Sequence, residues 1–329
     1  RALLGERAPF SDYLATTMGM RPIRADREAL SREAESLARE FASLGISWSP
    51  EGREPFRERF GRADLKTFET DLRDAADHLV ARLRAQVPGL PAPDFRVEMA
   101  NVDAYWSNWI DGSLEDGVRL QVNTHPRVEY LRNSHQALAA HEIAGHACHV
   151  AGLRMSGPDA VDPCTLNLAV HSCEAFQMEG LAQAMLQILV PPSEMGEEFQ
   201  LLERYRAYTG TRMNEAQLDV ESGAPIDAAS RGLARDIPLS KPLGQLSSLR
   251  DRSRDPLFRT YIHVYAPSRA LFLRALDLEP SARQAFLHAA ITRLWTPGQL
   301  VHLLEGRDPN AVATAPDPGP INEPIALGR

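Results

Sequence analysis

The stretch that decides the fold reads A-A-H-E-I-A-G-H-A-C-H-V and covers residues 139–150. It places His141, Glu142 and His146 inside a run of small and apolar residues that favour a helix. Two histidines with a carboxylate beside them are typical of a site where the histidines bind a metal ion and the carboxylate acts as a base. The stretch therefore predicts a metal-binding helix.

The spacing of the two histidines predicts an irregular helix. They are five positions apart, whereas the common zinc helix H-E-x-x-H has them four apart. At about 100° per residue, five steps leave the second side chain about 140° from the first, so a regular α-helix would not aim both rings at one ion. A one-residue widening of the π type would restore a common face, and such widenings are frequent at functional sites. We expect it at Gly145, because glycine tolerates backbone conformations that other residues resist.

A catalytic zinc site takes three protein ligands and leaves one position for water. Glu179 is the first candidate for the third ligand, because it lies downstream on a helix that could pack against the first. Glu174, about one turn earlier, is the alternative, and the carboxylate left over would accept the N–H of a histidine ligand. The donor set predicts Zn2+ as cofactor, with Glu142 accepting the proton of the attacking water.

Two other interpretations of the same helix stay open. Glu142, His146 and His149 lie at i, i+4 and i+7, so a helix without the widening would present them on one face. One carboxylate and two histidines are typical of non-haem iron enzymes. The scaffold could also serve a binding protein without activity, although the two downstream carboxylates argue against that.

Composition limits the class of protein. The chain has 329 residues, of which 43% are hydrophobic and 24% charged, as in an ordinary globular protein with a large core. The net charge of −8 argues against nucleic acid or an anionic membrane surface as partner. No apolar run approaches the roughly 20 residues of a membrane span. The three cysteines form no C-x-x-C pair and predict reduced thiols, so we expect a cytoplasmic protein, while a signal peptide removed before Arg1 would also fit.

Hydrophobic spacing predicts a mostly α fold (α+β), with helical lobes and a small sheet beside the metal helix. Residues 1–24 lack a sustained period and predict an irregular lead-in. Alternating runs predict strands at 95–99 and 118–123, and the second is the expected edge strand where an extended substrate would pair through its main chain. Helices are expected at 25–44, 63–87, 166–190, 197–219, 226–234, 256–276, 280–294 and 297–305.

These elements predict three parts of the chain. Residues 1–125 would form an N-terminal helical lobe with short strands, and residues 126–306 a zinc-binding catalytic lobe, with the substrate in the cleft between them. Residues 307–329 are rich in proline and predict an extended tail. That tail could pack on the body or hold a second copy of the chain in a homo-oligomer.

Several short motifs resemble one known family in their order along the chain. They are A-Y-W at 104–106, D-G-S at 111–113, V-N-T at 122–124, A-H-E at 140–142, G-H at 145–146 and E-G-L-A at 179–182. Together they are similar to bacterial zinc metallopeptidases of the glutamate-zincin type, whose metal helix reads H-E-x-x-P-G-H and whose third ligand lies in an E-G-W-A segment. The resemblance implies His141, His146 and Glu179 as zinc ligands, Glu142 as the base, and a small peptide or amide as substrate.

The chain departs from that family in three respects. It lacks the proline and reads H-E-x-x-G-H, a spacing similar to that of the dipeptidyl peptidase III family, which are also zinc peptidases. Members of the first family tend to be much longer, with an extra N-terminal helical half. Their C-terminal block R-Y-x-x-x-P-G-Q-A is matched only in part at 293–300, where Leu294 replaces the tyrosine. A non-proteolytic tailoring reaction on the same scaffold is therefore an alternative to peptide cleavage.

A zinc peptidase also needs a hydrogen-bond donor for the oxyanion that forms when water attacks a carbonyl. The candidates form one cluster in the sequence: Tyr261, His263, Tyr265 and Arg269, with Arg293 behind them. Tyr261 and Tyr265 are four apart and share a helix face, where they could equally be packing residues. We take Tyr261 and His263 as the catalytic candidates beside Glu142, with Tyr261 slightly favoured over Tyr265.

Overall fold

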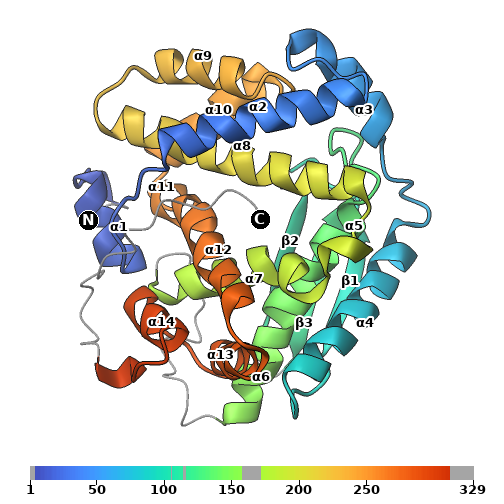
Figure 1. Cartoon of the computed structure of the whole chain (residues 1–329), viewed down its shortest axis with the longest axis vertical. Helices are drawn as coiled ribbons and strands as arrows, with labels where there is room; N and C mark the ends of the chain where they lie inside the picture. The colour runs from blue at the N-terminus through green and yellow to red at the C-terminus, as the bar shows by residue number, and fades with distance from the viewer. Residues whose placement is uncertain (1–3, 105, 114–115, 158–171, 312–329) are drawn as a thin grey trace.

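One three-stranded sheet stands beside the helix that carries His141 and His146, and helices make up most of the remainder (Figure 1). The structure is a computed structural model, and it describes residues 4–104, 106–113, 116–157 and 172–311. The mostly helical fold with a small sheet confirms the predicted fold class. Within the described ranges, no helix is both long and apolar enough to cross a membrane.

The sheet differs from the expectation in its strand order. Its strands are β1 (Phe95–Ala100), β2 (Asn108–Ser113) and β3 (Gly117–Asn123), in the order β1-β3-β2. The β3 strand pairs parallel with β1 and antiparallel with β2, so it is the central strand, and the prediction that 118–123 form an edge is wrong. The reason is that β2, from a segment expected to be a loop, folds back on β3 and takes the edge position.

From residue 25 onward the predicted helices are largely found, but 256–276 is divided into four short elements, and the helices Arg53–Phe60 and Pro242–Arg254 lie where no helix was expected. Residues 166–171 of one predicted helix lie outside the described part of the chain. The α-helices and the π-helix η3 are α1 (Phe10–Met18), α2 (Arg27–Ser43), α3 (Arg53–Phe60), α4 (Phe68–Gln86), α5 (Ser134–Leu138), η3 (Ala139–Ala147), α6 (Cys148–Ser156), α7 (Glu174–Leu189), α8 (Glu197–Glu221), α9 (Ile226–Asp236), α10 (Pro242–Arg254), α11 (Phe258–Tyr261), α12 (Tyr265–Leu273), α13 (Pro280–Thr292) and α14 (Pro297–Leu304). Short 3-10 turns are η2 (Pro50–Gly52), η5 (Pro192–Glu194), η6 (Ile262–Val264), η7 (Arg274–Asp277) and η8 (Pro309–Ala311).

Helix α1 corrects the expectation of an irregular lead-in. Phe10, Leu14 and Met18 lie four residues apart and are buried, so they form one stripe, which lies on the side of α1 that packs toward α7 and α11. Gly19 ends the helix in the left-handed conformation, at φ 65°. A stripe of three residues is too short to stand out as a period, and the packing partners come from far along the chain.

Two hydrophobic cores hold the helices together. The larger joins the sheet and α4 to η3, α7, α12, α13 and α14, and the smaller joins α2 and α3 to α8 and α9 (Figure 1). In the smaller core the ring of Phe41 lies 5.6 Å from that of Tyr205, edge to face. Each core draws on residues from both sides of residue 125, so the packing does not follow a boundary between lobes 1–125 and 126–306. Of the predicted tail, only 307–311 lie within the described residues.

Candidate metal centre and its pocket

The helix that carries the histidines is a π-helix, as the spacing predicts. Ala139–Ala147 form η3 between α5 and α6, which confirms the expected widening. The rings of His141 and His146 are brought to 4.8 Å between centroids, edge to face. Ligand atoms of His141, Glu142 and His146 all lie within 4.8 Å of one another, so this cluster could hold a metal ion.

Gly145 is required for a different reason from the one expected. It is absent from the glycines with positive φ, so it needs no unusual backbone conformation. A Cβ built at Gly145 would instead lie 2.6 Å from Cα of Ala182 on α7, far inside contact distance. Gly180 is equally tight, because its Cβ would lie 2.7 Å from that of Ser268 on α12. The two glycines let η3, α7 and α12 approach one another closely.

That close approach brings Glu179 to the histidines. Its Oε2 lies 3.6 Å from Nε2 of His141, and its Oε1 lies 3.8 Å from Nε2 of His146. The side chain is buried, and Oε2 has no hydrogen-bond partner among the described residues. Glu174 begins the same helix five positions earlier, which on a regular α-helix turns it about 140° away. Of the two candidates for the third ligand, the fold therefore brings Glu179 to the cluster.

Glu142 is held by a residue that the sequence did not suggest. Its Oε1 accepts a hydrogen bond of 2.6 Å from Nδ2 of Asn108, the first residue of β2. Its Oε2 is buried without a partner among the described residues. Burial, reinforced by the negative charge of Glu179, raises the pKa of Glu142 to about 8. Asn108 belongs to no motif, and only the pairing of β2 with β3 brings it to the helix.

The charges around the cluster fit a divalent cation. Burial, together with the neighbouring His146, holds the pKa of His141 well below its ordinary value, so the ring is neutral and can offer a lone pair. Glu142 and Glu179 each have one buried carboxylate oxygen without a hydrogen-bond partner in the described chain. A buried carboxylate is costly unless a charge compensates it. Neutral imidazoles and carboxylates are also the donors that zinc accepts.

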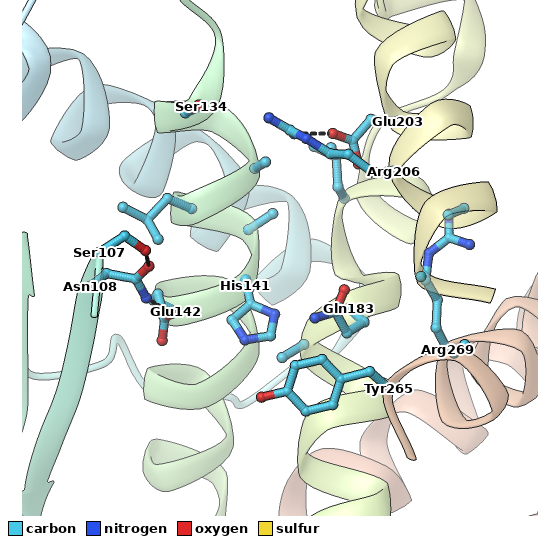
Figure 2. A pocket seen from close by; sticks show the side chains of 18 of the residues that line it. Ser107, Asn108, Ser134, His141, Glu142, Gln183, Glu203, Arg206, Tyr265 and Arg269 are labelled. Atoms are coloured by element: carbon cyan, nitrogen blue, oxygen red, sulfur yellow. Dashed lines mark hydrogen bonds and ion pairs between the residues drawn. The ribbon is translucent and has the colours of Figure 1, made fainter. Parts of the chain in front are cut away.

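Two tyrosines from neighbouring turns of the chain lie at the cluster in different ways. The hydroxyl of Tyr261 donates a 2.5 Å hydrogen bond to Oε1 of Glu179. Tyr265 packs its ring edge to face on Tyr261 and lines the cavity, with its hydroxyl on the side where His141 and Glu142 lie (Figure 2). Burial and the charge of Glu179 raise the pKa of both hydroxyls, so both remain protonated donors. Tyr261 thus donates to the carboxylate, whereas Tyr265 lines the pocket and also interacts with Glu179 and Tyr261.

The structure does not bring His263 to Glu142. His263 is 1% exposed, its ring centroid lies 5.1 Å from that of Phe10 in an edge-to-face arrangement, and Nδ1 lies 3.3 Å from Oε1 of Gln217. Burial and the charge of Arg252 lower its pKa to about 3, so it is neutral. Of the remaining donor candidates, Arg269 lines the cavity, whereas Arg293 follows α13, where its carbonyl accepts a 2.7 Å hydrogen bond from Gln177.

The iron interpretation loses its premise. It requires a helix without widening, so that Glu142, His146 and His149 share a face, whereas η3 is widened through residue 147. His149 lies in α6, is buried, and has no partner for Nε2 in the described chain. Its pKa is lowered to about 3 by burial, with a smaller contribution from His146.

A cavity of about 600 Å³ opens beside the cluster, within the range typical of small-molecule sites. One wall carries His141 and Glu142 on η3, with Ser107 and Asn108 at the edge of the sheet (Figure 2). Across from it, helices α8, α10 and α12 contribute three arginines, at positions 206, 252 and 269. The cavity therefore has an acidic and histidine-bearing wall and a cationic wall.

Comparison with known proteins supports the fold but not a function. No family model and no curated protein matches the chain. A solved structure described as the "putative lipoprotein from Colwellia psychrerythraea" is similar, with a TM-score of 0.66 and 11% sequence identity. The similarity covers 94% of this chain and 53% of that one, so this chain spans about half its length. At this identity the likeness bears on the fold alone.

Proposed function

We propose that this protein is a zinc-dependent hydrolase that cleaves a peptide or related amide bond in a short substrate. The observation that carries the proposal is the meeting of His141, His146 and Glu179 beside the buried carboxylate of Glu142. Two elements far apart in the chain contribute these groups, and two glycine contacts keep the elements close. The resemblance of the H-E-x-x-G-H and E-G-L-A segments to zinc peptidases supports the same conclusion.

His141, His146 and Glu179 would hold the metal ion. Two neutral imidazoles and one carboxylate are a donor set typical of catalytic zinc. Bound there, zinc would polarise the substrate carbonyl and make water more acidic. Tyr261 would fix the carboxylate of Glu179 through its 2.5 Å hydrogen bond, because outer hydrogen bonds of this kind orient metal ligands.

Glu142 would act as the general base. Asn108 binds Oε1 at 2.6 Å, which orients the carboxylate and leaves Oε2 free of hydrogen bonds among the described residues. That second oxygen can accept the proton of the attacking water and pass it on to the leaving amine. A base whose pKa lies near the working pH suits both transfers.

Tyr265 would donate to the oxyanion in place of Tyr261, which the sequence slightly favoured. Tyr265 lines the cavity with its hydroxyl on the side of His141 and Glu142, whereas Tyr261 is absent from the lining of that cavity and donates to Glu179. The substrate would lie along β2, because β2 is an edge strand and its first residue, Asn108, lines the cavity. An extended backbone can add to such an edge through main-chain hydrogen bonds.

Metal content and turnover together test the proposal. Elemental mass spectrometry of the purified protein should give about one zinc per chain, lost in His141→Ala and retained in His149→Ala. Iron in the parent, lost in His149→Ala, would instead support the non-haem iron enzyme. Glu142→Gln should keep the metal and lose at least about a thousandfold in kcat on the best of a panel of short peptides and amides. Undiminished turnover in that variant would exclude Glu142 as the base.

A further inference from the structure

Two arginines of the cationic wall, one buried and one half-buried, have no carboxylate partner among the described residues. Arg252 on α10 and Arg269 on α12 both line the cavity that His141 and Glu142 line on the other side. Neither forms an ion pair with any residue that the structure describes. Arginine side chains are seldom buried unless they are paired, so the buried Arg252 with the half-buried Arg269 beside it in one pocket requires an explanation.

The contacts of Arg252 are neutral. Its side chain is 8% exposed, and Nη1 donates a 2.7 Å hydrogen bond to Oδ1 of Asn214. Its Nε is buried without a partner within the described ranges. The charge of Arg252 acts on the ring of His263, which is neutral. Asn214 in turn donates a 2.7 Å hydrogen bond to the backbone carbonyl of His263. Burial lowers the pKa of Arg252 to about 10, so the guanidinium still carries its charge at neutral pH.

The acidic neighbour of Arg269 is already paired with another arginine. The charge of Glu203 acts on Arg269, but the carboxylate of Glu203 is hydrogen-bonded to Arg206 on the same helix (Figure 2). Another acidic residue in the lining, Glu129, is paired with Arg62 and lies 3.8 Å from the amine of Lys241. The charges of the two arginines are therefore not compensated from within the cavity.

Arg259 shows how this fold treats a buried arginine that is structural. It is 5% exposed, and its guanidinium binds both oxygens of Glu221 at 2.9 and 2.6 Å. A third hydrogen bond goes to the carbonyl of Ala8 at 3.0 Å. A buried cation left without an anion is costly, and an entering anion recovers that cost. Arg252 and Arg269 thus lack the carboxylate partner that Arg259 has. Both line the cavity, where a ligand can supply that carboxylate.

We propose that Arg252 and Arg269 form a subsite for a carboxylate of the substrate. Guanidinium groups bind carboxylates in a planar, bidentate manner that amines do not match. Since the cavity holds about 600 Å³, the carboxylate and the bond to be cleaved belong to the same small molecule. The substrate class is therefore a short peptide or amide with a free carboxylate, at its C-terminus or on a side chain. The nature of the cleaved bond rests on the proposed function; the subsite does not.

Binding of matched probes to the Glu142→Gln protein, as purified, tests the subsite without turnover. The probes for calorimetry are acetyl-Ala-Ala with a free C-terminus, its C-terminal amide, and acetyl-Ala-Asp-amide. The free acid should bind about 30-fold more tightly than the amide, as expected for a buried charge pair. Preferential binding of acetyl-Ala-Asp-amide would also support the subsite and assign it to an acidic side chain. Equal binding of all three probes, or equally tight binding of inorganic phosphate, would overturn it.

Two substitutions locate the preference on the wall. Arg252→Met and Arg269→Met should each reduce the preference for the acid to about threefold or less. Arg250→Met removes the same charge from an exposed position on α10 and should leave the preference unchanged. Arg269→Lys keeps the positive charge but loses the planar guanidinium that binds a carboxylate through two hydrogen bonds. It should therefore retain only part of the preference for the acid. If one methionine variant does not fold, the other carries the test; an unchanged preference in a folded variant excludes that arginine.

The outcomes separate the subsite from the proposed reaction. A carboxylate preference in binding, combined with no hydrolysis of any peptide or amide by the parent, would contradict the proposed hydrolase and support the subsite. Hydrolysis of the amidated peptide with the same kcat/KM as the free acid would support the proposed hydrolase and contradict the subsite. Hydrolysis that favours the free acid, and loses that preference in Arg269→Met, would support both.

Discussion

The two walls of the cavity are built in opposite ways. The metal wall, on η3 and α7, carries two buried carboxyl groups beside the histidines, and each has one oxygen without a hydrogen-bond partner in the described chain. The cationic wall, on α10 and α12, carries the buried Arg252 and the half-buried Arg269, neither with a carboxylate partner in the described chain. Each wall therefore leaves groups that an external partner would satisfy: a cation at the carboxyl oxygens and an anion at the guanidinium groups. The difference indicates a pocket that takes a cation on one side and an anionic group of the ligand on the other.

Among the variants that compare the two walls, substitution of Tyr265, which lies on the helix of the cationic wall and faces the metal wall, should show the largest effect. Tyr265 stands on α12 but faces the metal wall, so Tyr265→Phe removes the proposed oxyanion donor and should lower kcat by about 10²–10³ with little change in KM. Tyr261→Phe is the matched variant, and it should weaken zinc binding because Glu179 loses its hydrogen bond. Steady-state kinetics and metal titration measure both. If Tyr261→Phe lowered kcat with full metal while Tyr265→Phe did not, the two roles would be exchanged.

A smaller effect should follow from separating η3 and α7, the two helices that form the metal wall. Gly145→Ala places a Cβ 2.6 Å from Cα of Ala182, so η3 and α7 must separate. We expect a loss of about 1–3 kcal/mol in unfolding free energy and weaker zinc binding, with the Arg252 wall unaffected. Gly232→Ala on α9 is the control, because nothing lies within 4 Å of its Cβ and alanine favours the helix by about 0.5–1 kcal/mol. Unchanged zinc affinity in Gly145→Ala would mean that the close approach does not hold the ligands together.

The smallest effect is expected for His263, the buried residue next to Arg252, and it concerns how the free energy of unfolding depends on pH. His263 has a pKa lowered to about 3 in the folded protein, against about 6.5 when unfolded. Its contribution to stability is therefore complete above pH 6.5 and is lost as the pH falls toward 3, at about 1.4 kcal/mol per unit. Denaturant unfolding of the metal-free parent and of His263→Gln at pH 7.5, 6.5 and 5.5 should show a shallower acid decline in the variant. Equal slopes would contradict a buried neutral His263.

The comparison between variants is needed because another group works in the opposite direction. Glu142 has its pKa raised to about 8, so its burial favours the protonated form and the metal-free protein gains stability as the pH falls from 8 toward 4.5. This term is common to the parent and to His263→Gln, and it cancels in the difference. Zinc binding would remove it, since the cation compensates the carboxylate.

The sequence predicted the parts that depend on local spacing. The widened helix followed from two histidines five apart, and the limits of α8 and α9 followed from apolar stripes long enough to be recognised. Helix α1 was missed because its stripe has three residues, and β2 was missed because its main-chain partner β3 decides its conformation. The function of Gly145 was misjudged, since its neighbour Ala182 lies on another helix.

By itself, then, the sequence determined the fold class and the widened helix that carries the two histidines, because periodicity and short spacings are properties of a single segment. Only the tertiary structure decided which residues face that helix. Asn108 reached Glu142 through a strand pairing, Glu179 was chosen over Glu174 by helix packing, and Arg252 and Arg269 came together from two helices. Contacts between distant segments depend on close approach and on buried charge, and neither leaves a pattern in the chain.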